Sequence, residues 1–369
     1  MNKECREFLS KNGLNADDID FDLYSDLFKR EIELALDSRP SSLAMLSSHI
    51  KYSGMLPKDT GTAVIDAGGT NLRFAYVSFD KDGNESISDI RKYPMPGISE
   101  SADVEDLFDF LAEKISEYDS ENVGFCFSYP AYITKERDAK ILAFKKEINI
   151  SNAKDRLAAE GVNKALERRG LPKKNFTLLN DTTAALLGAS GTIKHPFGSA
   201  MALILGTGTN MCFVENRYVI NTECGNFNRF PQSSFDKEID AASSEPGLQQ
   251  AEKMIGGVYL PKIIKMASER FGGAEDEIRD EVYKRAAKFV VCEAAGILKH
   301  QNPQKDRISY MAAEGSTFMK AEALQSYIYK YFDEYIVNKL GFDIRIIKAE
   351  GSTLKGAAIA ALTSGRREK

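Results

Sequence analysis

The chain contains one local plan twice: an apolar segment runs into a turn of glycine, threonine and asparagine and continues directly as a second apolar segment. The copies are TAVIDAGGTNLRFAYVSF, residues 62–79, and AMALILGTGTNMCFVENRYVI, residues 200–220. Glycine has no Cβ, so the backbone N–H groups of such a turn can converge on an anion, and threonine adds a hydroxyl. A single turn of this kind is usually an ordinary hairpin, but the repeat favours two hairpins that together hold the phosphate chain of a nucleotide.

The residues after the first turn decide which kind of phosphate loop this is. Leu72, Phe74 and Tyr76 fall on one face and the residues between them on the other, which is the period of a strand. A Walker loop or a dinucleotide fingerprint would instead open a helix. Neither GxxxxGK[ST] nor a GxGxxG between strand and helix occurs in the sequence. The repeated unit is therefore a strand–turn–strand hairpin.

Length and composition limit the classes of protein to which the chain can belong. A chain of 369 residues is long for one core and predicts two lobes. The net charge of −5 offers no broad cationic field, so we expect neither nucleic acid nor a membrane surface as a partner. No N-terminal apolar segment and no apolar run near 18 residues is present, which favours a cytoplasmic protein. The five cysteines are far apart without a CxxC pair and are expected to be reduced thiols.

The apolar periodicity predicts two similar halves. Residues 1–56 are expected to be helical, with a helix starting at Ser41–Ser42. The elements expected after them are strands at 63–66, 71–79 and 86–93, a helix near 104–115, a strand at 123–128, a helix at 154–169 and a strand at 176–179. This β-β-β-α-β-α-β order is typical of a ribonuclease-H-like unit, and it begins again at Ala200.

The segment LLNDTTAAL, residues 178–186, lies between the two copies. Its apolar strand delivers Asp181 to the carboxyl end, and a helix is expected from Thr182. Asp181 could simply cap that helix, a position that aspartate favours. A carboxylate at a strand end beside two phosphate hairpins could also act as a general base. The two roles are compatible, and the segment alone leaves both open.

Several motifs, in order, resemble those of the hexokinase family. IDAGGTNLRF is similar to its first phosphate motif, LLNDTTAAL to its catalytic segment and LGTGTNMCFVE to its second phosphate motif. Further similar segments are SSLAMLSSHIKYSG, FCFSYPAYITKERDAKILAFKKEI, INTECGNF, EPGLQQAEKMIGGVYL and AEGSTLKGAAIAAL. The resemblance runs from about Ser41 to Leu362 and is to a short, bacterial-type hexokinase.

The resemblance implies a two-lobed, actin-like α/β fold with a sugar site in the cleft between the lobes. It places the small lobe at residues 60–180 with 354–369 and the large lobe at 1–59 with 181–353, and it implies that the lobes close on sugar. The reaction implied is phosphorylation of a hexose at its 6-hydroxyl, with Asp181 as general base. Other sugar contacts would come from Ser128, Lys146, Asn180, Asn210, Glu223 and Glu252. Asparagine and glutamate suit a polyol, because together they supply hydrogen-bond donors and acceptors.

For the nucleotide, the resemblance implies ATP with Mg²⁺. Asp66 would hold the metal through water, since Mg²⁺ keeps much of its hydration. Arg73 would neutralise the transferring phosphoryl group, although on a strand it could equally pair with a structural acid. The residues expected around the phosphates and adenosine are Gly68, Gly69, Thr70, Asn71, Gly206, Thr207, Gly208, Gly315, Ser316, Gly351 and Ser352.

Some positions depart from the family pattern. Lys145 stands where threonine is usual, Cys224 replaces a tryptophan, Cys126 a threonine and Glu314 an aspartate. Two other classes stay open: another actin-like sugar kinase, such as the ROK group, whose cysteine-rich zinc motif the sequence lacks, and a nucleotide-gated regulatory protein without catalysis. The choice among glucose, fructose and mannose depends on geometry that motif spacing does not encode.

Overall fold

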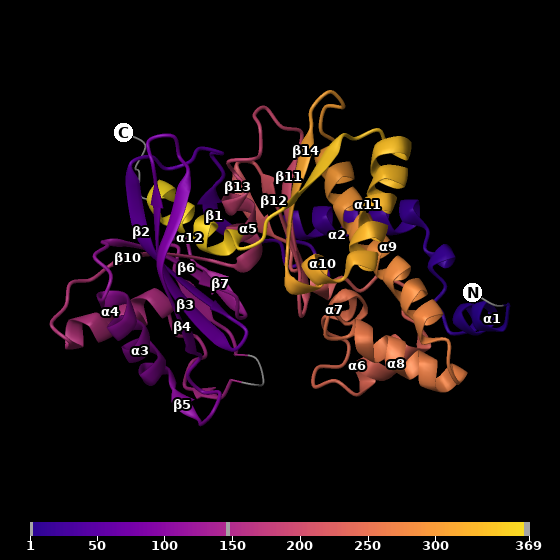
Figure 1. The fold of residues 1–369 in the computed structure, drawn as a ribbon, viewed down its shortest axis with the longest axis horizontal. Coiled ribbons are helices and arrows are strands. Elements are labelled where there is room, and N and C mark those ends of the chain that lie inside the picture. Colours follow the sequence, from indigo (N-terminus) through magenta and orange to yellow (C-terminus); the bar gives the residue numbers. More distant parts are fainter. Residues whose placement is uncertain (1–2, 145–147, 365–369) are drawn as a thin grey trace. The chain divides into compact units, whose positions relative to one another are not determined.

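The computed structural model describes residues 3–144 and 148–364 and divides the chain into two compact units (Figure 1). Unit 1 contains residues 1–45, 196–213 and 221–350, and unit 2 contains residues 46–195, 214–220 and 351–369. The boundaries of these units do not coincide with the lobe boundaries expected from the sequence. The expected lobes, which would close on sugar, stay a prediction.

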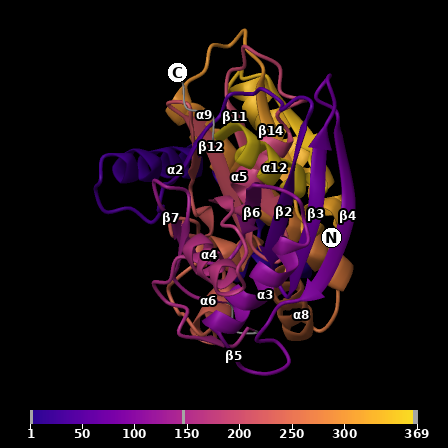
Figure 2. The same ribbon diagram turned by 90° about the vertical axis from the view of Figure 1, so that its left-hand side faces the viewer.

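Unit 2 is built on a five-stranded sheet in the order β10-β6-β2-β3-β4 (Figures 1 and 2). Strands β2, β3 and β4 form an antiparallel meander, and β6 and β10 run parallel to β2. The strands are β2 (Thr60–Gly68), β3 (Asn71–Phe79), β4 (Glu85–Pro94), β6 (Asn122–Phe127) and β10 (Asn175–Leu179). The parallel strands bring three carboxyl ends to one edge of the sheet.

Helices cover both faces of this sheet. Val123 and Phe125 on β6 join the core beneath α3 (Val104–Ser116) and α4 (Ala158–Arg168), whereas Gly124 faces α12 (Ser352–Ser364). Helix α12 also packs on α5 (Asp181–Gly188). Shorter strands complete the unit: β1 (Leu46–Lys51) beside β13 (Tyr218–Asn221), β5 (Ala102–Asp103) with β9 (Ile150–Ser151), and β7 (Ala131–Ile133) with β8 (Ala139–Ile141).

The contact between α5 and α12 depends on glycine. A Cβ on Gly356 would lie 1.8 Å from the carbonyl oxygen of Ala184, and one on Gly188 would lie 2.3 Å from that of Ser352. Helix α12 therefore approaches the backbone of α5 more closely than any side chain would permit. This close packing fixes α5, and hence Asp181 at its first turn, against the sheet.

Unit 1 repeats the plan with more helices. Its strands run in the order β12-β11-β14-β15, with β12 (Thr209–Glu215) antiparallel to β11 (Ala200–Leu205) and β14 (Ser309–Glu314) and β15 (Ile344–Lys348) in the parallel direction. The helices are α1 (Lys3–Lys11), α2 (Phe21–Leu36), α6 (Ser234–Ala241), α7 (Gln250–Ile255), α8 (Leu260–Phe271), α9 (Glu275–Gln301), α10 (Ser316–Lys320) and α11 (Glu322–Tyr331). A π-helix at Phe332–Lys339 and 3-10 turns at Ala16–Asp18 and Cys224–Asn226 complete it. The long helix α9 is mostly buried and packs on α2, α8 and α11.

The repeated β-β-β-α-β-α-β order is confirmed, with additional helices inserted in unit 1. The helix predicted from Ser41–Ser42 is wrong: the chain there is irregular and then forms strand β1. The serines do not cap a helix but bind Glu31, since the Ser42 backbone N–H donates to Glu31 Oε2 at 2.6 Å and Ser41 Oγ donates to the same oxygen at 2.9 Å.

Candidate active site

Three strand ends of unit 2 form a row across its sheet. Asp66 on β2 pairs in register with Cys126 on β6, and Cys126 pairs with Leu179 on β10. Burial raises the pKa of the Cys126 thiol well above its usual value, and the negative charges of Asp66 and Asp181 raise it further. Because the three strands are in register, the predicted metal-binding and catalytic aspartates lie at one edge of the sheet.

Two residues further along the chain from Asp66, Cys126 and Leu179 come Gly68, Ser128 and Asp181, at or just beyond the ends of their strands. A Cβ on Gly68 would lie 3.4 Å from Ser128 Oγ and 3.8 Å from an oxygen of Asp66. Ser128 is itself held by the strand edge, because its backbone N–H donates to the carbonyl of Ala67 at 2.9 Å. The structure thus brings together the first phosphate turn, the predicted sugar-binding serine and the predicted base.

The first hairpin has an open turn. Gly69 adopts a φ of +61° and a Cβ there would meet no atom within 4 Å, so its face is available to a ligand. Tyr129 Oη donates to the carbonyl of Gly69 at 2.9 Å, and the Met95 N–H donates to that of Thr70 at 3.0 Å. Because its carbonyls are held by the protein, the turn keeps a fixed shape. Asn71 donates its side-chain amide to Thr70 Oγ1 at 3.1 Å.

Asp66 and Arg73 form an ion pair across the first hairpin. Nε of Arg73 donates to Oδ2 of Asp66 at 2.9 Å, and Nη2 donates to the same oxygen. Asp66 is 5% exposed, whereas the Arg73 side chain is 41% exposed. The guanidinium thus extends from a buried carboxylate toward solvent, beside the phosphate turn. This position is compatible with both roles considered for Arg73, which are pairing with a structural acid and neutralising the transferring phosphoryl group.

Asn180, and not Asp181, caps helix α5. Asn180 Oδ1 accepts from the Thr183 N–H at 3.0 Å and from Thr182 Oγ1 at 3.0 Å, so the capping role considered for Asp181 is wrong. Asp181 is the first helical residue, where its carboxylate accepts from the Thr182 N–H at 2.8 Å. It therefore lies at the first turn of α5 with one carboxylate oxygen bonded to the backbone.

The second hairpin lies in unit 1, and hydrogen bonds to its carbonyl groups hold its turn. The carbonyl of Gly206 accepts from Thr317 Oγ1 at 2.7 Å and from the Gly257 N–H at 2.9 Å. The Val258 N–H donates to the carbonyl of Thr207 at 3.1 Å. Because these hydrogen bonds hold its carbonyl groups, the second turn keeps a fixed shape, as the first turn does.

Gly315 and Ser316 adjoin this second turn. A Cβ on Gly315, whose φ is +112°, would lie 2.4 Å from the carbonyl of Leu205, and a Cβ on Gly206 would lie 3.8 Å from the Ser316 nitrogen. In unit 2, Ser352 is the first residue of α12 and Gly351 directly precedes that helix. Gly315 and Ser316 therefore lie next to the second phosphate turn, and the adenosine contacts of all four stay a prediction.

Four polar side chains of unit 1 gather beside that turn. Asn210 Nδ2 donates to Asn221 Oδ1 at 2.9 Å, and Asn221 Nδ2 donates to Glu223 Oε1 at 2.6 Å. A Cβ on Gly208 would lie 2.0 Å from Oε2 of Glu252, so that carboxylate rests directly on the turn. Burial raises the pKa of Glu223, and hydrogen bonds from the two asparagines oppose the shift. The predicted sugar-binding residues of unit 1 are thus one cluster.

Asn221 was missed by the sequence analysis. It is 7% exposed and joins Asn210 to Glu223, while Glu223 itself has a left-handed φ of +52°. The signal was present in INTECGNF, because the asparagine lies two residues before the glutamate at the end of a strand. Lys146 and Lys145, the remaining positions discussed for sugar binding, lie outside the described residues.

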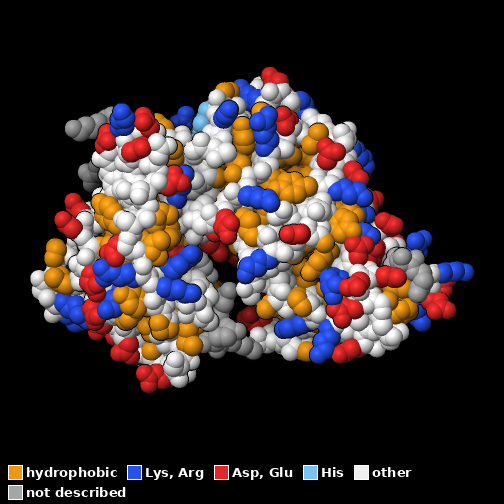
Figure 3. All heavy atoms as spheres, viewed as in Figure 1, with side chains coloured by type: hydrophobic (Ala, Val, Ile, Leu, Met, Phe, Trp, Pro, Cys, Tyr) orange, Lys and Arg blue, Asp and Glu red, His pale blue; other side chains and the backbone are white. Residues whose placement is uncertain are grey.

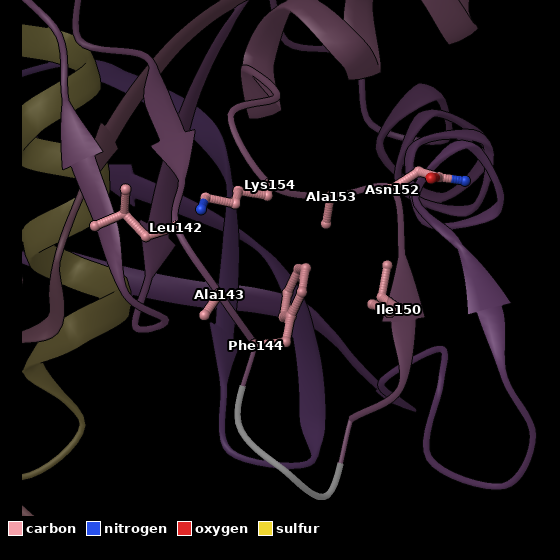
Figure 4. A pocket seen from close by; sticks show the side chains of 7 residues that line it. All are labelled: Leu142, Ala143, Phe144, Ile150, Asn152, Ala153 and Lys154. Carbon is pink, nitrogen blue, oxygen red and sulfur yellow. The ribbon is translucent and has the colours of Figure 1, made fainter. Parts of the chain in front are cut away.

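Unit 2 contains a cavity of about 470 Å³ (Figure 4). Phe144, Ala153 and Ile150 point toward one another across it. Its lining consists of Leu142, Ala143, Phe144, Ile150, Asn152, Ala153 and Lys154. Three of these residues belong to the stretch expected to bind sugar, and none of the described lining residues is a predicted site residue.

Three further features of the described residues are their surface charge, the grouping of potential metal ligands and the polarity of the helices. On the face shown in Figure 3, acidic and basic side chains are interspersed in each unit. Within residues 3–144 and 148–364, no three His, Cys, Asp or Glu side chains are grouped so that they could hold a metal ion by themselves. Over the same ranges, every helix is too short or too polar to span a bilayer. The five cysteines are free thiols, as predicted.

Comparison with known proteins identifies relatives along most of the chain. Hexokinase-5 of Oryza sativa subsp. japonica is 33% identical over 282 residues, which are 65% of this chain and 53% of that protein. Hexokinase-1 of Nicotiana tabacum is 30% identical over 312 residues, 75% of this chain and 61% of that protein. The matches therefore span only about 53–61% of the length of these two relatives.

Solved structures share the fold. A crystal structure described as hexokinase superposes with a TM-score of 0.81 at 19% identity, covering 98% of this chain and 99% of that one. A Schistosoma mansoni hexokinase complexed with glucose gives a TM-score of 0.75 at 21% identity, with the same coverage. A ROK-family glucokinase from Streptomyces griseus gives 0.54. The predicted fold class, a duplicated actin-like α/β fold, is confirmed.

Family profiles cover both halves of the chain. One profile described as hexokinase matches residues 5–190, and a second with the same description matches residues 200–271 and 274–363. The matched segments contain both phosphate hairpins, Asp181 and the polar cluster of unit 1. The chain belongs to the hexokinase family.

Proposed function

We propose that this protein transfers the γ-phosphoryl group of ATP to the 6-hydroxyl of a hexose, with D-glucose as the first candidate. The observation that carries the proposal is the alignment of Gly68, Ser128 and Asp181 at adjoining strand ends, beside the Asp66–Arg73 pair. A phosphate turn, a hydroxyl-binding serine and a carboxylate base are the parts that phosphoryl transfer to an alcohol requires. Membership of the hexokinase family supports the same chemistry.

On the sugar side, the carboxylate of Asp181 accepts the proton of the 6-hydroxyl as the hydroxyl oxygen attacks phosphorus. Asn180 uses its Oδ1 for the helix cap, so its amide N–H groups are the atoms directed to a sugar oxygen. Ser128, Lys146 and the cluster of Asn210, Glu223 and Glu252 bind the other hydroxyls. The proposal requires that these groups of both units bind the same hexose. It also includes closure of the lobes when the sugar binds.

On the phosphate side, the two glycine turns offer backbone N–H groups to the phosphates. Arg73 neutralises charge on the transferring group. The residues fit a hydrated Mg²⁺, because such an ion takes one or two protein carboxylates together with phosphate oxygens and water. Asp66 would hold it through water, and when bound it would neutralise negative charge on the phosphates. Asp66 is paired with Arg73 here, so binding of the nucleotide and its metal would redistribute the contacts of that arginine.

The proposal extends to the setting of the reaction. Product phosphorylated at the 6-hydroxyl is the form in which a hexose enters glycolysis, and we place the protein there and in the cytoplasm. The support is the family and the sequence composition. The other sugar kinases that share the fold, including the ROK glucokinase, are similar at only 18% identity and define no substrate for this chain.

The test is a coupled assay of ADP release from Mg²⁺–ATP with glucose, fructose, mannose and no sugar in parallel. We expect ADP release that depends on a hexose, with hexose 6-phosphate formed in equal amount. Equal ADP release with and without sugar would indicate an ATPase and exclude this proposal.

A further inference from the structure

Lys253 is a buried cation that the proposed reaction does not use. It lies on α7 in unit 1, directly after Glu252, and is 4% exposed. Its ammonium group donates to Oδ1 of Asp240, to Oγ of Ser243 at 2.9 Å and to the carbonyl of Glu245 at 2.9 Å. A lysine has three N–H donors, so these three contacts use all of them. Burying a charge is costly even when it is paired in this way, and the position of this lysine asks for an explanation.

All three acceptors belong to the segment that leads from α6 to α7. Asp240 lies in the last turn of α6, and its carboxylate also accepts from the Gly247 N–H, at 3.1 Å to Oδ1 and 2.9 Å to Oδ2. Ser243 Oγ donates to the Asp240 carbonyl at 2.7 Å. Lys253 therefore ties α7 both to the end of α6 and to the loop 242–249 that connects the two helices.

Helix α7 needs support from its surroundings. It has six residues, and an isolated helix of that length is not stable in water. Gln249, which precedes it, has a left-handed φ of +49°, and its side chain makes no capping hydrogen bond with the described residues of the chain. The end of α7 is held separately, because the N–H groups of Gly257 and Val258 donate to carbonyls of the second phosphate turn. The contacts of Lys253 thus hold the beginning of the helix, in the turn that carries Glu252.

Glu252 lies against two turns of the candidate site. A Cβ on Gly208 would lie 2.0 Å from Oε2 of Glu252, and a Cβ on Gly225 would lie 3.1 Å from Cβ of Glu252. Gly208 belongs to the second phosphate turn, and Gly225 belongs to the 3-10 turn Cys224–Asn226. A small shift of α7 would therefore move the Glu252 carboxylate relative to both turns.

We propose that Lys253 is a positioning residue for hexose binding, which holds α7 so that Glu252 meets the sugar in one orientation. The inference rests on the proposed function, because that function assigns Glu252 to the sugar. Loss of the ammonium group frees the beginning of α7 from the end of α6, and the Glu252 carboxylate then samples more positions. Ordering it again opposes hexose binding. The contacts of Gly257 and Val258 with the second phosphate turn persist, so nucleotide binding changes little.

The experiment measures the affinities of Lys253→Met for glucose and for Mg²⁺–ATP by calorimetric titration, together with Tm. Methionine keeps an apolar stem of similar length and removes the ammonium group. We expect glucose affinity to fall about fivefold, a part of the effect of one hydrogen bond to a charged group, and ATP affinity to stay within about twofold of wild type. Asp240→Ala removes the charged acceptor at a half-buried position and should act in the same way, so it tests the inference even if Lys253→Met fails to fold.

A double substitution shows whether Lys253 acts through Glu252. If it does, adding Lys253→Met to Glu252→Gln should change glucose affinity by less than about twofold, because the carboxylate that Lys253 positions is already gone. Two independent effects that multiply would overturn the inference.

The matched control is Lys288→Met, which changes another buried lysine of unit 1 in the same way. Lys288 is 8% exposed and donates to the Ala16 carbonyl at 2.8 Å, so its replacement should lower Tm and leave glucose affinity unchanged. The same pattern in Lys253→Met and Asp240→Ala would mean a purely structural role and overturn the inference. Glu252→Gln separates the two proposals. If it leaves glucose binding intact, the sugar site itself is misplaced; if it weakens glucose binding and Lys253→Met does not, the positioning role alone fails.

Discussion

Asn221 donates its side-chain amide to Oε1 of Glu223 at 2.6 Å while its own oxygen accepts from the Glu223 backbone N–H at 3.2 Å. One asparagine thus fixes both the main chain and the carboxylate of a residue with a left-handed backbone. Asn210 donates to the same Asn221 oxygen at 2.9 Å. The hydrogen bonds give Glu223 a fixed orientation before any sugar arrives, which lowers the cost of ordering it on binding.

Substitutions in the cluster of Asn210, Glu223 and Glu252 should weaken sugar binding without weakening nucleotide binding. Glu223→Gln and Glu252→Gln are each expected to weaken glucose binding about tenfold or more, because hydrogen bonds to charged groups contribute about 1.5–3 kcal/mol. ATP binding should change little, and calorimetric titration with each ligand measures both. Glu269→Gln is the control, since its side chain is 67% exposed on α8. Unchanged glucose affinity with weakened ATP affinity would mean that the two subsites are exchanged.

Glu223 should also set an acid limit on sugar binding. Burial raises its pKa above the ordinary 4.5, and the carboxylate must be ionised to accept from a sugar hydroxyl. We therefore expect glucose affinity to fall as pH decreases through this raised value, and Glu223→Gln to abolish the dependence.

The same shift predicts an effect on stability with a definite sign. A raised folded pKa means that the contribution of Glu223 to stability is complete below its unfolded pKa and is lost as pH rises through the folded one. Glu223→Gln should therefore raise Tm at pH 7 while weakening glucose binding. A lower Tm at pH 7 together with an unaltered pH profile would contradict the burial argument.

The strands around the site were readable from sequence because their signals are local. The period-two alternation after Asn71 predicts β3 with its observed bounds, Asn71–Phe79. Ser41 and Ser42 failed as helix signals because a capping serine cannot be told from one that binds an acid ten residues earlier, in this case Glu31.

The sequence predicts the motifs of the site but not the contacts between their residues. Nothing in the spacing shows that Arg73 pairs with Asp66, although the two lie opposite each other on β2 and β3. The cap assigned to Asp181 belongs to Asn180, one residue earlier, because the choice depends on where the backbone leaves the strand.

Arg73 should matter for nucleotide binding more than for folding. Arg73→Ala leaves the carboxylate of Asp66 buried without its guanidinium partner, which costs about 1–3 kcal/mol in the free energy of unfolding. Because Arg73 also faces the phosphate turn, we expect a higher KM for Mg²⁺–ATP and a lower kcat, measured in the coupled assay. Arg91→Ala, which breaks an exposed pair with Asp89 on β4, should leave both unchanged. Wild-type kinetics in Arg73→Ala would restrict that arginine to a structural role.

The contact between α5 and α12 provides a test of the fold itself. Glycine to alanine within a helix usually stabilises by about 1 kcal/mol. At Gly356 the added methyl would meet the Ala184 carbonyl at 1.8 Å, so we expect destabilisation instead, by about 1–3 kcal/mol or more. Chemical denaturation measures the sign. Gly170→Asn, at an open position with φ +71° that asparagine tolerates, should be neutral.

We propose Asp181 as the base for phosphoryl transfer to a hexose, and the direct test is to measure kcat and glucose affinity in Asp181→Asn. Asparagine keeps the shape of the side chain and removes its basicity. We expect kcat for hexose 6-phosphate formation to fall about 10²–10⁴-fold while glucose still binds with an affinity near wild type. A kcat within about threefold of wild type, with the same dependence on glucose, would contradict the assignment.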